Sequence, residues 1–172
     1  MIKLGHVSID GTKIKANASD AKTYDDSRID REIGRWLEQA QDIDQKEDEQ
    51  FGPDKTGSEI PKDIRNQKQR LQRLKELKKK LEQSDSEKVN MTDPDAAFMK
   101  TNSGIKTAYN AQAAVDSAQQ VIVAADVTTD ASDAQQLLPM IEQTEENLSG
   151  KITQCSADAG YSSGENLKAL QG

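Results

Sequence analysis

The sequence predicts a mixed α/β fold with an inserted pair of helices, and the evidence is a change of hydrophobic period along the chain. Near both ends of the chain, apolar residues alternate with polar ones or run together, as they do in strands. Over residues 26–83, apolar residues instead recur at helical spacing among charged ones. A length of 172 residues suits one ordinary domain, or a small domain that carries an insertion.

The first predicted strand covers residues 7–14, where Val7, Ile9 and Ile14 are the apolar positions. Asp10-Gly11 lies inside it, and this dipeptide is common in hairpin turns, so we expect a turn or bulge there. Residues 17–24 are polar and predict a loop.

Two amphipathic helices follow, over residues 26–47 and from Pro61 to about residue 83, separated by a polar stretch with two glycines and a proline over 50–58. Each apolar stripe is narrow, so we expect the helices to pack mainly on each other as an antiparallel, coiled-coil-like hairpin. The sequence thus predicts a hairpin over 26–85 inserted into a core formed by 1–25 and 91–172. The stripes consist of Ile29, Ile33, Trp36, Leu37, Ala40 and Ile43 in the first helix, and Ile64, Leu71, Leu74, Leu77 and Leu81 in the second.

Strand character returns after a turn at 92–95. Strands are predicted over 105–115 and 120–127, and the apolar run at 121–123 is typical of a strand covered on both faces. A helix with its apolar face at 137–148 then leads to a strand over 151–157, which predicts a crossover onto the same sheet. Ser162 and Glu165 have the spacing of a capping box for a last helix that ends at Leu170.

Composition restricts the function classes. The chain contains no apolar run long enough to span a membrane and begins without a signal-peptide pattern, and its one cysteine, Cys155, fits a reducing cytoplasm. The net charge of −7 argues against strong DNA binding by this chain alone. The cations over 62–80 are the one candidate phosphate-contacting surface. We favour the alternative that they pair with the acids of the first helix at 42–49, because antiparallel packing would bring these opposite charges together.

Two aspartates are candidate metal ligands. Asp10 lies in the first strand and Asp158 directly follows the last one. If these strands are neighbours in the sheet, the two carboxylates could converge on Mg²⁺ or Mn²⁺. The spacing also permits a purely structural interpretation, in which Asp10 belongs to a turn and Asp158 caps the following helix.

Three blocks of sequence resemble, in order, those of bacterial insertion-sequence transposases of the Asp-Asp-Glu (DDE) type. The first surrounds Asp10, the second lies between Asp93 and Asp116, and the third surrounds Asp158. The blocks read VSIDGTKIKANAS at 7–19, DPDA at 93–96 with YNAQAAVD at 109–116, and ADAGYSSG at 157–164.

The resemblance implies a ribonuclease H-like fold and metal-dependent cleavage and strand transfer of transposon DNA with Mg²⁺ or Mn²⁺. It implies that Asp10 and Asp158 are the first two acids of the triad. The third acid, a glutamate, is expected beyond Gly172, because Glu165 is too close to Asp158. We therefore expect a truncated, inactive chain that lacks the C-terminal strand and helix of the fold and binds DNA weakly. Its exposed edge strand at 151–157 predicts self-association.

Other polar residues have ordinary structural interpretations. Tyr109, Asn110 and Gln112 fit hydrogen bonding within the sheet as well as they fit catalysis. Four aspartates, at 116, 126, 130 and 133, are expected in turns and caps. Among them, Asp126 is the one whose functional role we would test. A rival hypothesis is a non-catalytic interaction module, or regulatory transposase remnant, in which Leu71, Leu74 and Leu81 bind a partner helix.

Overall fold

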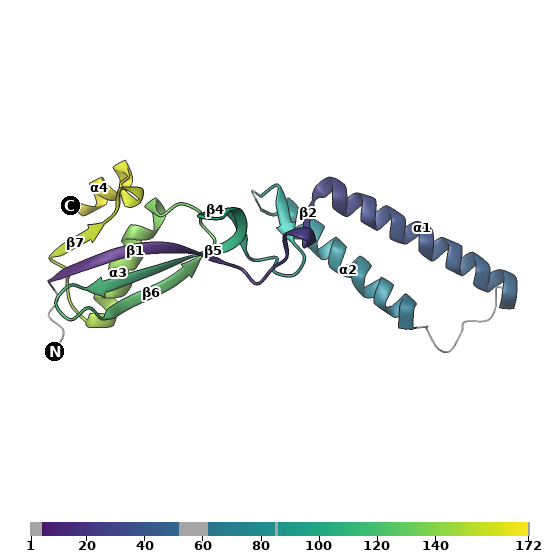
Figure 1. The fold of residues 1–172 in the computed structure, drawn as a ribbon, viewed down its shortest axis with the longest axis horizontal. Coiled ribbons are helices and arrows are strands. Elements are labelled where there is room, and N and C mark those ends of the chain that lie inside the picture. Colours follow the sequence, from purple (N-terminus) through teal and green to yellow (C-terminus); the bar gives the residue numbers. More distant parts are fainter. Residues whose placement is uncertain (1–4, 52–61, 85, 172) are drawn as a thin grey trace. The chain divides into compact units, whose positions relative to one another are not determined.

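The structure, a computed structural model, describes residues 5–51, 62–84 and 86–171 (Figure 1). The chain divides into two compact units. Residues 1–17 and 95–172 form the sheet unit, and residues 18–94 form the hairpin unit.

The sheet unit contains a mixed five-stranded sheet built around one long strand, β5. On one side β5 pairs antiparallel with β1, and on the other it pairs antiparallel with β4 and β6 at different points along its length. β1 also pairs, in parallel, with β7. The strands are β1 (His6–Lys15), β4 (Ala97–Thr101), β5 (Gly104–Asp116), β6 (Ile122–Thr128) and β7 (Gln154–Ala157).

Helix α3 (Leu137–Leu148) follows the short 3₁₀ helix η2 (Ala134–Gln136) and covers one face of this sheet (Figure 1). The 3₁₀ helix η3 (Ala159–Tyr161) and helix α4 (Gly164–Leu170) follow β7. Removal of apolar side chains from water between sheet and helix supplies the main stabilising term of the unit. The buried core consists of Val7, Ile9, Ala114, Val123, Ala124, Leu137, Met140 and Tyr161.

The hairpin unit has a core of its own. Helices α1 (Asp26–Phe51) and α2 (Lys62–Glu82) lie side by side (Figure 1). The 3₁₀ helix η1 (Asp20–Lys22) and strand β2 (Thr23–Asp25) precede α1 in the chain, and strand β3 (Lys88–Asn90) comes after α2. β2 and β3 pair to form a two-stranded sheet. Lys78 pairs with Asp30 and Arg70 with Glu32, so the helices run antiparallel. The buried apolar residues are Tyr24, Ile29, Leu74, Leu77, Leu81 and Val89.

Most predicted elements are present, with several corrections. β1 is unbroken, so the expected turn at Asp10-Gly11 is wrong. Of the apolar run 121–123, Val121 and Ile122 are exposed and only Val123 is buried, so the expected strand covered on both faces is wrong for this run. The N-cap of α4 is Ser163, whose side chain accepts a hydrogen bond from the Asn166 amide, and the predicted Ser162–Glu165 capping box is wrong.

Boundaries also differ. The strand predicted from residue 151 begins at Gln154, and the first long helix extends past its expected end to Phe51. The rest of the predicted break, with Pro61, lies outside the described residues. Three short strands, β2, β3 and β4, were not predicted.

Within the described residues, no helix is both long and apolar enough to cross a membrane.

Candidate active site

The register between β1 and β7 brings the two candidate acids together. The parallel pairing ends at Ile9 opposite Ala157, and the next residues along the two strands are Asp10 and Asp158. Neighbouring strands lie about 4.8 Å apart. The condition set from the sequence, that the two aspartates lie on adjacent strands, is therefore met, with Asp158 at the carboxyl end of β7.

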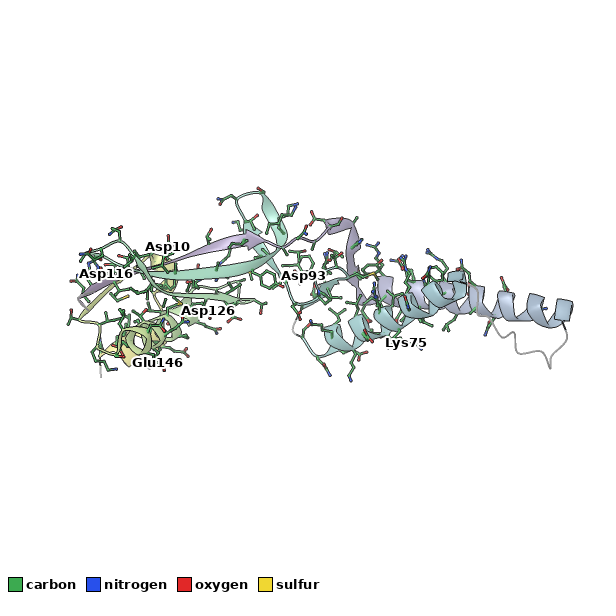
Figure 2. The ribbon with its side chains drawn as sticks, turned by 90° about the horizontal axis from the view of Figure 1, so that it is seen from below. Asp10, Lys75, Asp93, Asp116, Asp126 and Glu146 are labelled. Atoms are coloured by element: carbon green, nitrogen blue, oxygen red, sulfur yellow. The ribbon has the colours of Figure 1, made fainter. Side chains whose placement is uncertain are left out.

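Each carboxylate is oriented by a glycine amide. The Gly11 amide donates to Oδ1 of Asp10 at 2.8 Å, and the Gly160 amide donates to Oδ1 of Asp158 at the same distance. The second contact makes Asp158 the N-cap of η3. Both aspartates are exposed, so both remain accessible to an ion or a phosphate (Figure 2 labels Asp10).

A third carboxylate, that of Asp133, lies beside the pair and is tightly hydrogen-bonded. Its Oδ1 accepts from Nζ of Lys13 at 2.9 Å, from Asn110 at 2.7 Å and from Gln112 at 3.0 Å. Partial burial alone would raise the pKa of Asp133, but the hydrogen bonds from these three donors outweigh burial and lower it. Asp133 is therefore a fixed, ionised carboxylate paired with Lys13.

The close approach of these side chains explains the glycine that follows Asp10. A Cβ atom at Gly11 would overlap Nε2 of Gln112 and would lie 2.9 Å from the Tyr161 hydroxyl and 3.1 Å from Oδ1 of Asp133. A Cβ at Gly160 would lie 2.9 Å from Oδ1 of Asp158. Gly11 is thus required by packing from distant parts of the chain rather than by a turn.

Tyr161 lies within electrostatic range of all three acids. Its hydroxyl is buried and donates to Oε1 of Gln112. Burial and then the negative charges of Asp133, Asp10 and Asp158 raise the pKa of the phenol far above its usual value. The hydroxyl therefore stays protonated and serves as a hydrogen-bond donor.

Sequence reasoning gave Asp133 only a turn or cap role, did not single out Lys13, and selected Asp126 among these aspartates. Asp126 is exposed on β6, and its carboxylate accepts from the adjacent amide of Val127 (Figure 2). Asp116 accepts from the Gln119 amide, and Asp130 accepts from Gln136, as expected for turn residues. One signal was available: Lys13 lies on the same face of β1 as Val7 and Ile9, and a lysine on a buried face needs a partner.

The two acids suit a hard divalent cation, because carboxylate oxygens are the ligands that Mg²⁺ and Mn²⁺ prefer. They do not make a complete protein site: across the described ranges, no group of three or more His, Cys, Asp or Glu side chains is arranged to hold a metal ion. Glu165 lies in the first turn of α4, where it is exposed.

Comparison with known protein families gave one finding. The family model described as "Transposase DDE domain" matches residues 3–172, nearly the whole chain. The match confirms the resemblance drawn from the three sequence blocks. No significant match was found to a curated protein or to a solved structure.

Gly11→Ala is expected to destabilise the sheet unit by about 1–3 kcal/mol, because the new methyl group overpacks against a Gln112 side chain that hydrogen bonds hold in place. Urea denaturation of both proteins measures the difference. Gly34→Ala, in a helix and with no atom near the added methyl, is the matched control and should be neutral or stabilising by up to about 1 kcal/mol. Equal stabilities for the Gly11 variant and the wild type would contradict the packing described here.

Proposed function

We propose that this chain, which belongs to the Transposase DDE domain family, supplies Asp10 and Asp158 as the first two acids of the metal site for DNA cleavage and strand transfer. The family acts in DNA transposition, and its domains generally use divalent metal ions. The observation that carries the proposal is the β1–β7 register, which makes two exposed aspartates neighbours at the end of a parallel strand pair.

The chemistry of the residues supports this assignment. A pair of divalent ions, when bound, activates a water or hydroxyl group and stabilises the leaving oxygen of a phosphodiester. Asp10 and Asp158 offer carboxylate oxygens that the amides of Gly11 and Gly160 already orient. Asp10 and Asp158 by themselves would repel a DNA phosphate, and a cation held by them would offset that repulsion.

The sheet order supports a ribonuclease H-like assignment, with three antiparallel strands followed by a helix and a parallel strand beside β1. In this assignment the hairpin unit is an insertion between β1 and the strands that follow it. The domain limits of 26–85 for the hairpin, and of 1–25 with 91–172 for the core, stay predictions.

Two described cations of α2 form ion pairs with acids of α1, in agreement with the structural interpretation of this segment. Arg70 pairs with Glu32, and Lys78 pairs with Asp26 and Asp30. Most of the acidic side chains at 42–49, to which the prediction assigned this pairing, lie outside the described residues. Other cations line a pocket on the hairpin unit, whose cations are Lys22, Arg73 and Lys80 against one acid, Glu76. We propose that this basic pocket, defined by these three cations, contacts DNA phosphates.

The interaction-module hypothesis gains no support from the packing. Of the three leucines that it needs, Leu74 and Leu81 are buried inside the hairpin unit and Leu71 is half-buried. A partner helix could reach them only after the unit opens. Self-association through β7, which pairs with β1 alone among the described strands, stays a prediction.

Mn²⁺ is expected to bind at Asp10 and Asp158 and to broaden the amide NMR signals of Gly11 and Gly160 before others, because paramagnetic broadening falls steeply with distance. Asp10→Asn and Asp158→Asn should each abolish the effect. Asp126→Asn is the matched control, since the Asp126 carboxylate is also exposed and also accepts from the next amide. Broadening that survives in both site variants would contradict the assignment.

Residues 1–172 as a separate protein are expected not to nick supercoiled plasmid DNA with Mg²⁺ or Mn²⁺, since the described residues provide no third acid for the metal site. Gel electrophoresis of the plasmid checks this. Nicking that Asp10→Ala abolishes would show that the chain is active by itself.

Removal of the cations of the basic pocket should lower the affinity for DNA and make that affinity less dependent on salt concentration. For Arg73→Ala with Lys80→Ala, the slope of log K against log salt concentration should fall by roughly 0.9 for each DNA phosphate that the variant no longer neutralises. Fluorescence anisotropy with duplex DNA measures the slope. Lys75→Ala with Lys79→Ala removes the same charge from α2 outside the pocket and should change the slope less (Lys75 is labelled in Figure 2). Equal effects of the two double variants would leave no special role for the pocket.

A further inference from the structure

We propose that Asp133, paired with Lys13, is a positioning residue that fixes the turn carrying Asp158 against β1 beside Asp10. This inference rests on the proposed function, because it gives Asp133 a role in holding the two metal-binding acids together. Asp133 lies outside the three sequence blocks that resemble the transposase family, and from the sequence it was expected only in a turn or cap.

The carboxylate of Asp133 lies between the backbone segments that carry the two acids. On one side, its Oδ1 is 3.1 Å from the position that a Cβ would occupy at Gly11, the residue after Asp10. On the other side, its Oδ2 is 3.7 Å from the corresponding position at Gly160, two residues after Asp158. One carboxylate therefore lies near the residues that follow both acids, and the lack of a side chain at Gly11 permits its close approach on that side.

Hydrogen bonds carry this contact into the turn after Asp158. Gln112 donates to Asp133 and accepts from the Tyr161 hydroxyl, so the ring of Tyr161 is tied to Asp133 through one side chain. Asn166 donates to the backbone oxygen of Tyr161 at 2.7 Å and to that of Ala134, next to Asp133, at 2.6 Å. The segment 158–161 is thus held through both a side chain and its backbone.

The positive charge of Lys13 neutralises the negative charge of Asp133. Asp10, Asp133 and Asp158 each act on the Tyr161 phenol, so this part of the sheet unit contains three negative charges. The ammonium group of Lys13 lies 2.9 Å from Asp133, and the two side chains are only 18% and 25% exposed. A charge pair at this depth is costly to break from one side, because the remaining charge is left without its partner.

The same contacts argue against a direct metal-binding role for Asp133. Its Oδ1 already accepts three hydrogen bonds, one of them from the Lys13 ammonium group, so this oxygen is engaged by protein donors. The described residues contain no three-ligand set that includes it. Residues that orient metal ligands typically contribute 10–100-fold to metal affinity without touching the ion.

The test compares Asp133→Ala and Asp133→Asn in two measurements. The first is amide hydrogen exchange of the metal-free chain at Gly160, whose amide donates to the Asp158 carboxylate and so reports its position directly. The second is Mn²⁺ affinity, from titration of the folded chain. Asp133→Ala should speed exchange at Gly160 and weaken Mn²⁺ binding 10–100-fold. Asp133→Asn keeps an oxygen acceptor for the three donors but leaves the Lys13 charge without its partner, so it should restore both properties only in part.

Lys13→Met is a second variant in case Asp133→Ala does not fold. It should reproduce the faster exchange at Gly160, whereas Lys15→Met, an exposed lysine on the same strand, should not. Unchanged exchange and unchanged Mn²⁺ affinity in folded Asp133→Ala would overturn the proposal. Loss of Mn²⁺ binding in Asp133→Asn as complete as in Asp10→Asn would also overturn it, because Asp133 would then be a ligand. If the wild-type chain binds no Mn²⁺ at Asp10 and Asp158, the proposed function fails, while exchange at Gly160 still decides the positioning role.

Discussion

The parallel pairing of β1 with β7 is the constraint on which the candidate site depends. β5 organises the antiparallel part of the sheet, but β7 is the strand that brings the third sequence block back to the first across almost 150 residues. A shift of one residue in that register would turn Asp158 and its turn to the wrong side of the sheet. The core contacts of Val7 and Ile9, which lie opposite β7, therefore fix the register as well as the stability of the unit.

Around this pairing the molecule concentrates negative charge and offsets part of it. Two acids face solvent, while the third is ionised, partly buried and paired with a lysine. The carboxylates of Asp10 and Asp158 can therefore accept an ion, whereas that of Asp133 holds the local structure. The hairpin unit contains a separate core, and cations gather locally in its basic pocket within a chain that is acidic overall.

The sequence predicts the elements in which the hydrophobic pattern repeats over enough residues to be recognised, including β1, β5, α3 and both long helices. It fails for β2, β3 and β4, because three to five residues carry too little periodicity. Asp10 and Asp158 follow from position and from family resemblance. Gly11 was misread because its neighbours, Gln112 and Asp133, are about a hundred residues away in sequence. The role of Asp133 beyond a turn or cap was missed because its segment contains several turn-forming residues and no local feature that distinguishes the one paired with Lys13.

The most direct test of the central claim is a crystal structure grown with Mn²⁺, with data collected at a wavelength where manganese scatters anomalously. We expect an anomalous peak between the carboxylates of Asp10 and Asp158, with oxygen–metal distances of roughly 2.0–2.3 Å and Asp133 still bound to Lys13. A peak elsewhere, or two carboxylates that point apart on the same strand pair, would contradict the assignment of these acids to a metal site.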